Sequence, residues 1–544
     1  MDNYSSVVGH EQVLLNQFRE EEALGMMFEL DIKVARANYP NLHLAAQGSL
    51  RKGDDSWRVL HDGTHGVRLN NRIVIEDRTR MPTSSDIRSC MEECAESGGR
   101  YLSLQADVRK AHRRVLHRKE DWPLLGLSLE EGRCWINRVG TFGLSTASYW
   151  WGRLAALAGR LTWAILDTNH DLFQLIYADD LRWMAAGPQA CKLLLFCLLV
   201  WKMIGSPFKH SKLQFGTEME WIGFWIDMTN FQLGMSVKHV EWLAKVLKDL
   251  VDGKPCLIRD LLQFIGRLGF STGALEFGKP FMGPLYTWAS AVPSGTYMSV
   301  PAAIRVLMHW FLARLQSGGA VTSTRRTKGS MLLFKADAKG ARGYCVLGGY
   351  MVSDDGGSRG PWFSLKVLEC EAPWLFKEGE GSRRIATTEM LSSLLCLWLF
   401  TSEVVAGSSG GIGLTGLTDN AGNAFILSKM CTTKLPVAPV LLEMAKLMFD
   451  HRLNFTLSWV RRDDNTQADA LTNEDFSGVD LSKRINITWT QVMIAFPDLL
   501  TYSSMHEELE KDLATLKDKR RKQQQTMGRG YGVKRHKAVE KEPW

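Results

Sequence analysis

The side chains best suited to catalysis are three carboxylates that short apolar segments would bring to one point. Asp179 and Asp180 follow the apolar run 172–177 and precede another, which predicts a β-hairpin with both acids at its turn. Asp107 ends a further strand-like run, 101–106. Adjacent carboxylates repel each other, and a hard cation such as Mg²⁺ removes that repulsion while also binding substrate phosphates. Carboxylates delivered by two strands are what a two-metal phosphoryl-transfer site requires.

The Asp-Asp dipeptide alone is weak evidence for such a site. It also occurs at 54–55, 354–355 and 463–464, where an ordinary solvated turn is the simpler interpretation. The copy at 179–180 differs because Tyr-Ala precedes it, apolar strands flank it, and a third acid lies upstream in a matching setting.

Composition limits the class of protein. The chain has 544 residues, enough for three or four domains, and its 45% hydrophobic and 23% charged residues are typical of a folded soluble protein. The net charge of +7 suits a polyanionic partner. Cys90 and Cys94 are the only closely spaced cysteines, which favours reduced thiols in an intracellular protein of the cytoplasm or nucleus. With no signal peptide and no apolar run long enough to span a bilayer, we expect no membrane partner.

Four more acids each border an apolar element in the C-terminal half. Asp337 lies on the first strand of a β-rich segment, and Glu389 lies where a helix is expected to start. Asp419 ends another strand, and Asp469 lies in NTQADALTN after a further one. A carboxylate that serves only solvation has no need of such a setting.

The YADD sequence at 177–180, with Asp107 upstream, resembles motifs C and A of reverse transcriptases. Upstream, Lys52, Arg58 and the Leu-Asn pair at 69–70 resemble the fingers segment of gypsy-like LTR and DIRS-like retroelement polymerases. The resemblance implies that Lys52 and Arg58 hold the phosphates of the incoming nucleotide. Lys52 and Arg58 flank the turn GDDS at 53–56, and taken alone this segment would be read as an ordinary solvated hairpin.

Two further positions follow from the resemblance. His112 stands where the family commonly has Tyr or Phe as a steric gate against the ribose 2′-hydroxyl. A His ring can block that hydroxyl or hydrogen-bond to it, so sugar discrimination stays open. Phe142 and Gly143 belong to FGLS, which resembles motif B beneath the templating base pair, with Thr146 as the expected N-cap of the following helix.

Downstream of YADD, the order of motifs continues. Lys212 resembles the motif D lysine that protonates the pyrophosphate leaving group, although a single Lys is usually a surface residue. Trp221 and Gly223 resemble the primer grip of motif E. The segment 236–320 reads as helices with a core-packing apolar stripe and resembles the thumb and connection.

The C-terminal acids resemble those of the RNase H fold. In that family Asp337, Glu389, Asp419 and Asp469 would bind two Mg²⁺, with Mn²⁺ as the alternative ion, and direct water at an RNA phosphodiester. Where many RNases H carry a His before the last acid, this chain has Arg461-Arg462-Asp463. This departure lowers the expected cleavage rate and leaves the expected fold unchanged.

We therefore expect an α+β multidomain protein in which a right-hand polymerase (fingers, palm and thumb) is followed by an RNase H-like α/β domain. The expected parts are a helical leader 1–44, fingers and palm 45–235, thumb, connection and linker 236–330, an RNase H-like domain 331–480, and a C-terminal extension 481–544 with a basic, disordered tail.

The expected function is that of a retrotransposon RNA-directed DNA polymerase with RNase H endonuclease activity. Its partners would be an RNA template, a DNA or RNA primer, RNA–DNA hybrid and dNTPs. The alternative is a domesticated or decayed polymerase fold that acts as a non-catalytic RNA-binding scaffold. The sequence leaves the template, the priming route and the oligomeric state open.

Overall fold

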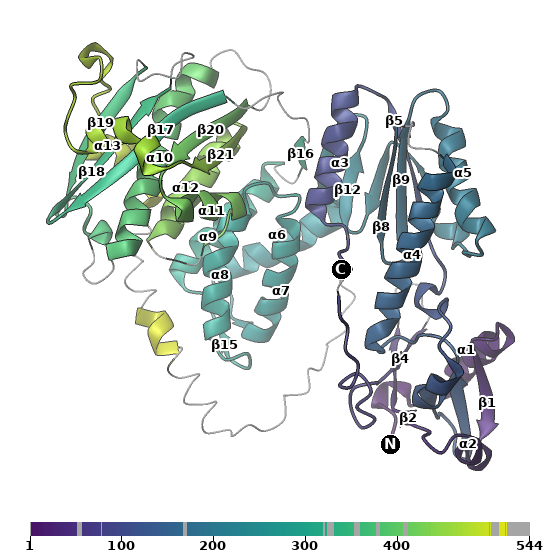
Figure 1. The fold of residues 1–544 in the computed structure, drawn as a ribbon. Helices are drawn as coiled ribbons and strands as arrows, with labels where there is room; N and C mark the ends of the chain where they lie inside the picture. Colours follow the sequence, from purple (N-terminus) through teal and green to yellow (C-terminus); the bar gives the residue numbers. More distant parts are fainter. Residues whose placement is uncertain are drawn as a thin grey trace. The chain divides into compact units, whose positions relative to one another are not determined.

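The computed structural model divides into two compact units, one ending at Phe231 and one beginning at Gln232 (Figure 1). The structure describes residues 2–51, 57–77, 79–166, 171–318, 321–323, 331–352, 360–376, 381–405 (side chains from 384 to 401), 412–432, 434, 436–499, 501, 511–516 and 518. Lys52 and most of the basic tail lie outside these residues. Helices combine with several separate sheets, which confirms the α+β class. In the described part of the chain, no helix is long and apolar enough to cross a membrane.

The central sheet of the first unit carries the YADD turn. Its order is β10-β5-β9-β8 and all its pairings are antiparallel. The strands are β5 (Tyr101–Asp107), β8 (Leu172–Tyr177), β9 (Asp180–Ala186) and β10 (Gln214–Gly216). The associated helices are α3 (Ser84–Ser97), α4 (Ser145–Leu166) and α5 (Ala190–Met203). Trp151, Trp183 and Trp201 are buried in the core that the sheet forms with α4 and α5.

The predicted cap of α4 is wrong by two positions, because the residue before the helix is Leu144. The helix begins at Ser145, so Thr146 is its second residue rather than its cap. A residue from another part of the chain caps the helix instead: the side chain of Asn70 accepts a hydrogen bond from the Ser145 amide.

A second sheet of the first unit has the order β1-β7-β6-β2, and a separate hairpin pairs β3 with β4. These strands are β1 (Met27–Asp31), β2 (Leu44–Ala45), β3 (Gln47–Arg51), β4 (Trp57–His61), β6 (Gly126–Leu127) and β7 (Arg133–Asn137). Two helices, α1 (Glu11–Ala23) and α2 (Ile32–Asn38), complete this part. The leader predicted as helical therefore also contributes strands, and β1 pairs along its whole length with β7.

A tight hairpin ends the first unit. It joins β11 (Glu218–Trp221) to β12 (Phe224–Asp227) through Ile222 and Gly223. Both loop residues have positive φ, 43° and 88°, as a two-residue hairpin turn of the I′ type requires.

The second unit begins with a helical part. Its helices are α6 (Val237–Val251), α7 (Ile258–Ser271), α8 (Lys279–Ala291) and α9 (Ala302–Gln316), and its short strand pairs are β13 (Gln232–Met235) with β16 (Val321–Ser323) and β14 (Cys256–Leu257) with β15 (Tyr297–Met298). The Leu and Phe stripe of α7 is buried, as expected for core packing.

A five-stranded mixed sheet follows in the order β19-β18-β17-β20-β21. Its strands are β17 (Met331–Ala341), β18 (Tyr344–Met351), β19 (Trp362–Leu368), β20 (Ile412–Thr418) and β21 (Leu453–Trp459). The first three run antiparallel, and β20 and β21 run parallel to β17. The helices are α10 (Gly381–Val405), α11 (Ala421–Lys429), α12 (Val437–Asp450), α13 (Thr466–Thr472) and α14 (Trp489–Ala495).

The expected helix start at Glu389 is wrong, because α10 begins at Gly381. Glu389 therefore lies in the third turn. The hydroxyl of Thr388 donates back to the carbonyl of Arg384 at 3.2 Å, so this Thr is bonded within the helix rather than capping it.

Candidate active sites

The three acids of the first unit meet at one end of the central sheet. Asp107, the last residue of β5, lies directly opposite Asp180, the first residue of β9. Asp179 is in the turn, and its carbonyl accepts a hydrogen bond from the amide of Val108 at 2.9 Å. Burial, followed by the charges of Asp179 and Asp107, raises the pKa of Asp180 to about 6. This mutual repulsion is what a bound divalent cation would relieve.

Lys212 lies against these acids, as its predicted role requires. Its ammonium forms an ion pair with the Oδ2 atom of Asp107. The preceding turn is fixed as well, since the amide of Lys209 donates to the Asp107 carbonyl at 2.9 Å. Burial opposes the charge on Lys212, but the hydrogen bond and charge of Asp107 outweigh it and raise the pKa of the lysine. Lys212 is therefore a protonated donor beside the three carboxylates.

A hydrogen bond from α4 stabilises the YADD turn. Ala178 has a φ of 50°, in the left-handed region that a residue with a Cβ rarely adopts. Its carbonyl accepts a hydrogen bond of 2.8 Å from the indole Nε1 of Trp151, a buried residue of α4. Sequence analysis did not single out Trp151; its only sequence signal is its place on the helix that follows FGLS.

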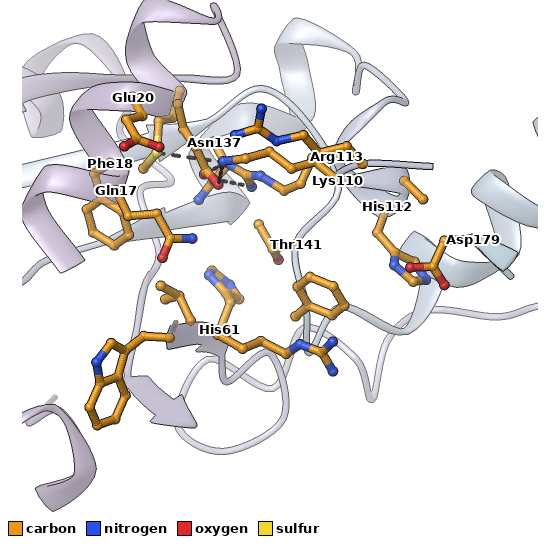
Figure 2. A pocket seen from close by; sticks show the side chains of 18 of the residues that line it. Gln17, Phe18, Glu20, His61, Lys110, His112, Arg113, Asn137, Thr141 and Asp179 are labelled. Atoms are coloured by element: carbon orange, nitrogen blue, oxygen red, sulfur yellow. Dashed lines mark hydrogen bonds and ion pairs between the residues drawn. The ribbon is translucent and has the colours of Figure 1, made fainter. Parts of the chain in front are cut away.

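A cavity of about 1160 Å³ opens beside the acids (Figure 2). The predicted site residues that line it are Arg58, Asp107, His112, Phe142, Asp179 and Lys212. Figure 2 shows His112 next to Asp179 at one end. The Phe142 ring lies between two groups, with the Arg58 guanidinium 4.7 Å from its centroid and the His112 ring 5.1 Å away. Burial lowers the pKa of His112, the charge of Arg58 lowers it further, and Asp179 opposes both.

Gly143 is required by the close approach of the backbone. It has a φ of 104°, and a Cβ there would overlap the carbonyl oxygen of His61. Asn70 spans this turn: its Nδ2 donates to the Gly143 carbonyl at 2.7 Å, and its Oδ1 accepts from the Ser145 amide at 2.9 Å. The Leu-Asn pair noted in the sequence thus has a structural role in positioning Phe142.

The inner end of the cavity is built from buried polar residues that sequence analysis did not identify. Arg113 forms an ion pair with Glu21 and donates to Asn137 at 2.6 Å. Figure 2 shows His61 and Thr141 facing the same space. Both ring nitrogens of His61 lack a hydrogen-bond partner among the described residues, and burial followed by the charge of Arg113 lowers its pKa to about 4. A neutral His61 in a polar cavity of this size suits ordered water.

The two residues predicted to form a primer grip, Trp221 and Gly223, lie in the β11–β12 hairpin. Trp221 is almost fully buried. Gly223 and its neighbour Ile222 form the turn itself. The Trp221 indole is therefore packed inside the protein and not presented at the surface.

In the second unit, Asp337, Glu389 and Asp419 converge and could hold a metal ion. One carboxylate oxygen of each lies within 4.8 Å of the others. Burial and the charge of Asp419 raise the pKa of Glu389 to about 8, and the same two causes raise that of Asp337 to about 6. Glu389 Oε2 and Asp419 Oδ1 are buried without a hydrogen-bond partner in the described part of the chain. These oxygens are the ligands that a hard divalent cation prefers.

Asp469 lies near this group but is not part of it. Its Oδ1 accepts from Arg462 at 3.1 Å and its Oδ2 from Asn473 at 2.9 Å. The same helix, α13, supplies Thr472, whose hydroxyl donates to Asp337 at 3.1 Å and which sequence analysis did not identify. Both carboxylate oxygens of the fourth predicted acid are thus engaged by neighbouring side chains, one of them from the Arg461-Arg462-Asp463 run noted in the sequence.

Comparison with solved structures finds similar chains. One is the foamy viral protease–reverse transcriptase dRH in complex with double-stranded DNA, with a TM-score of 0.48 and 12% sequence identity, covering 84% of this chain and 70% of that one. Another is the foamy viral protease–reverse transcriptase in complex with RNA/DNA hybrid, with a TM-score of 0.47 and 10% identity, covering 84% of this chain and 54% of that one. At 10–12% identity the likeness concerns the fold alone. No family model and no curated protein matches the sequence.

Proposed function

We propose that the chain is an RNA-directed DNA polymerase of a retroelement, with a second, RNase H-type nuclease site. The observation that carries the polymerase assignment is the meeting of Asp107, Asp179 and Asp180 beside Lys212. Chance Asp-Asp turns would not bring a third acid and a protonated lysine to the same point.

The three acids would hold two Mg²⁺, or Mn²⁺, which would activate the primer 3′-hydroxyl and bind the triphosphate. Burial, followed by the charges of Asp179 and Asp107, raises the pKa of Asp180, and a bound cation would offset this cost of its charged form, which supports the fit. The substrates would be an RNA template, a DNA or RNA primer and dNTPs.

The other lining residues have separate tasks in this proposal. Arg58 offsets phosphate charge, together with Lys52, which is assigned from sequence alone. Lys212 gives its proton to the departing pyrophosphate. His112 and Phe142 close the cavity around the nucleotide, and Asn70 fixes Phe142 through the turn at Gly143.

The nuclease assignment rests on the cluster in the second unit. Asp337, Glu389 and Asp419 would hold the metal ions that direct water at the RNA strand of an RNA–DNA hybrid. Asp469 would complete the site once its hydrogen bond with Arg462 is broken. The buried, unpartnered oxygens of the cluster support a cation at this position.

Primer extension on an RNA template with Mg²⁺ and dNTPs tests the polymerase assignment. We expect synthesis by the wild type and none by Asp179→Asn/Asp180→Asn. Asp463→Asn/Asp464→Asn, which changes another Asp-Asp pair in the second unit, is the matched control and should extend normally. A folded wild type that binds hybrid but never extends a primer would overturn the assignment in favour of a non-catalytic scaffold.

A further inference from the structure

The two helices α4 and α5 expose large apolar side chains instead of burying them. On α4 the residues that face the core are mostly small, such as Ala155, Ala158 and Gly159. The opposite side presents larger ones, each 39–57% exposed: Trp150, Leu154, Leu157, Leu161 and Ile165. A helix that is apolar on all sides is normally covered on all sides.

The exposed residues of α4 have the spacing of a helix-packing seam. Trp150, Leu154, Leu157 and Leu161 alternate steps of four and three residues, as the a and d positions of a heptad do. This pattern favours another helix as the covering element.

The apolar surface continues onto α5. That helix exposes Leu195, Phe196, Leu199 and Met203, each 48–77% exposed. The two helices contact each other, and each also contacts a strand of the central sheet, β8 for α4 and β9 for α5. Figure 1 shows them alongside β8 and β9. The two rows of side chains therefore belong to one face of the first unit.

The size of this face matches a protein interface. An aromatic side chain has about 200 Å² of surface and the seven aliphatic side chains have less, so these nine, each about half exposed, present at most about 900 Å². A standard interface buries about 800 Å² on each partner, whereas the largest apolar patch of a monomer is about 300–600 Å².

We propose that this α4–α5 face is the contact between two copies of the chain. Helix packing around a two-fold axis would pair α4 with its counterpart, because an isologous interface needs only one self-complementary surface. The proposal does not depend on the polymerase activity.

The charges of the face make a distinguishing prediction. Neither helix contains Asp or Glu. Of the basic residues on the two helices, Arg153 is paired with Asp77, and Arg160, Lys192 and Lys202 add net positive charge to the face. Between two copies these charges repel, but exposed charges contribute little against the burial of so much apolar surface. Salt screens the repulsion, so it should strengthen self-association. Contact with an acidic protein or an anionic lipid would instead weaken with salt.

Sedimentation equilibrium of the full chain, from about 1 to about 100 μM, tests the proposal. We expect a dimer whose Kd falls as NaCl rises from about 0.1 to about 0.5 M. Leu157→Glu/Leu161→Glu should raise the Kd at least about 100-fold, and Leu199→Glu at least about tenfold. Ile494→Glu, which charges an exposed apolar residue of the second unit, is the control and should leave the Kd unchanged. Circular dichroism establishes that each variant is folded.

Three outcomes would overturn the proposal. The wild type could be monomeric over the whole concentration range. Alternatively, it could form a dimer whose Kd the α4 and α5 variants leave unchanged, or a dimer whose Kd rises with salt. Binding of a monomeric wild type to phosphatidylserine vesicles, lost in Leu157→Glu/Leu161→Glu, would assign the face to a lipid surface instead.

Discussion

The indole of Trp151 donates a hydrogen bond of 2.8 Å to the carbonyl of Ala178, the left-handed residue of the YADD turn. This bond links the second turn of α4 to the backbone immediately before Asp179. The position of the clustered carboxylates therefore depends on a buried residue of the neighbouring helix.

Trp151→Phe tests this link. The substitution removes the indole N–H and leaves a smaller aromatic ring in a buried site, so the unfolding free energy should fall by about 2–3 kcal/mol. A displaced Asp179 should lower kcat for primer extension by about tenfold or more. Trp163→Phe, on the same helix and packed against the same core, is the control for both measurements. Equal loss of kcat in the two variants would contradict a specific role for the hydrogen bond.

Gly143→Ala should destabilise the first unit severely. Its positive φ alone would cost an Ala about 1–2 kcal/mol. The added Cβ would also overlap the carbonyl of His61, which raises the expected loss above about 3 kcal/mol. Gly132→Ala is the matched control, because Gly132 also has a positive φ, 77°, but has open space around it. Chemical denaturation of the two variants separates the costs, and similar losses would show that the contact with His61 is unimportant.

Glu389 should make the second unit less stable as pH rises when divalent cations are absent. Its pKa rises from 4.5 to about 8 on folding, so the folded state binds the proton more tightly than the unfolded state does. Wild-type stability should therefore fall between about pH 4.5 and about pH 8, in total by a few kcal/mol, since each pKa unit corresponds to about 1.4 kcal/mol.

Glu389→Gln lacks this ionisation and should melt above the wild type at pH 8 but not at pH 4. Added Mg²⁺ should raise the melting temperature of the wild type more than that of the variant. The exposed Glu369→Gln should behave as the wild type in both experiments. A pH profile shared by wild type and Glu389→Gln would contradict the assignment of the charge penalty to this residue.

Asp337→Asn should abolish RNA cleavage and leave primer extension intact. Asp337 belongs to the second unit, and its carboxylate is one of the three that could hold a metal ion there. A loss of at least about 100-fold in cleavage of a labelled RNA–DNA hybrid is expected, because the site would lose one of its metal ligands. Concurrent loss of extension by a folded variant would argue against two independent sites.

The acids could be predicted from the sequence because each one borders a strand or helix whose apolar pattern is local. The opposition of Asp107 and Asp180 follows from two strands and a turn. The bonds from Trp151 to Ala178 and from Asn70 to Gly143 could not be predicted, because they join residues 27 and 73 positions apart whose meeting depends on tertiary packing. The expected start of α10 near Glu389 is wrong because the helix extends to Gly381, through residues that lie before the apolar run on which the prediction rested.

The hydrogen-bond partner of Asp469 could not be predicted from the sequence either, because no sequence pattern shows which neighbouring group a carboxylate binds. Here it selects Arg462, at 3.1 Å, instead of the oxygen cluster. The charge of Arg462 also opposes the rise in the pKa of Glu389, so the arginine offsets part of the negative charge that would attract a cation.

Arg462→Ala should therefore tighten metal binding at the second site. With the guanidinium gone, the cluster is more negative and Asp469 is released toward it. The Mg²⁺ concentration that gives half-maximal RNA cleavage should fall severalfold, while the Mg²⁺ dependence of primer extension stays the same. Arg461→Ala removes a neighbouring exposed arginine and is the control for a general change of charge. If both variants shift the Mg²⁺ requirement equally, the effect is long-range electrostatics; if Arg462→Ala alone shifts it, the contact with Asp469 is what restrains the site.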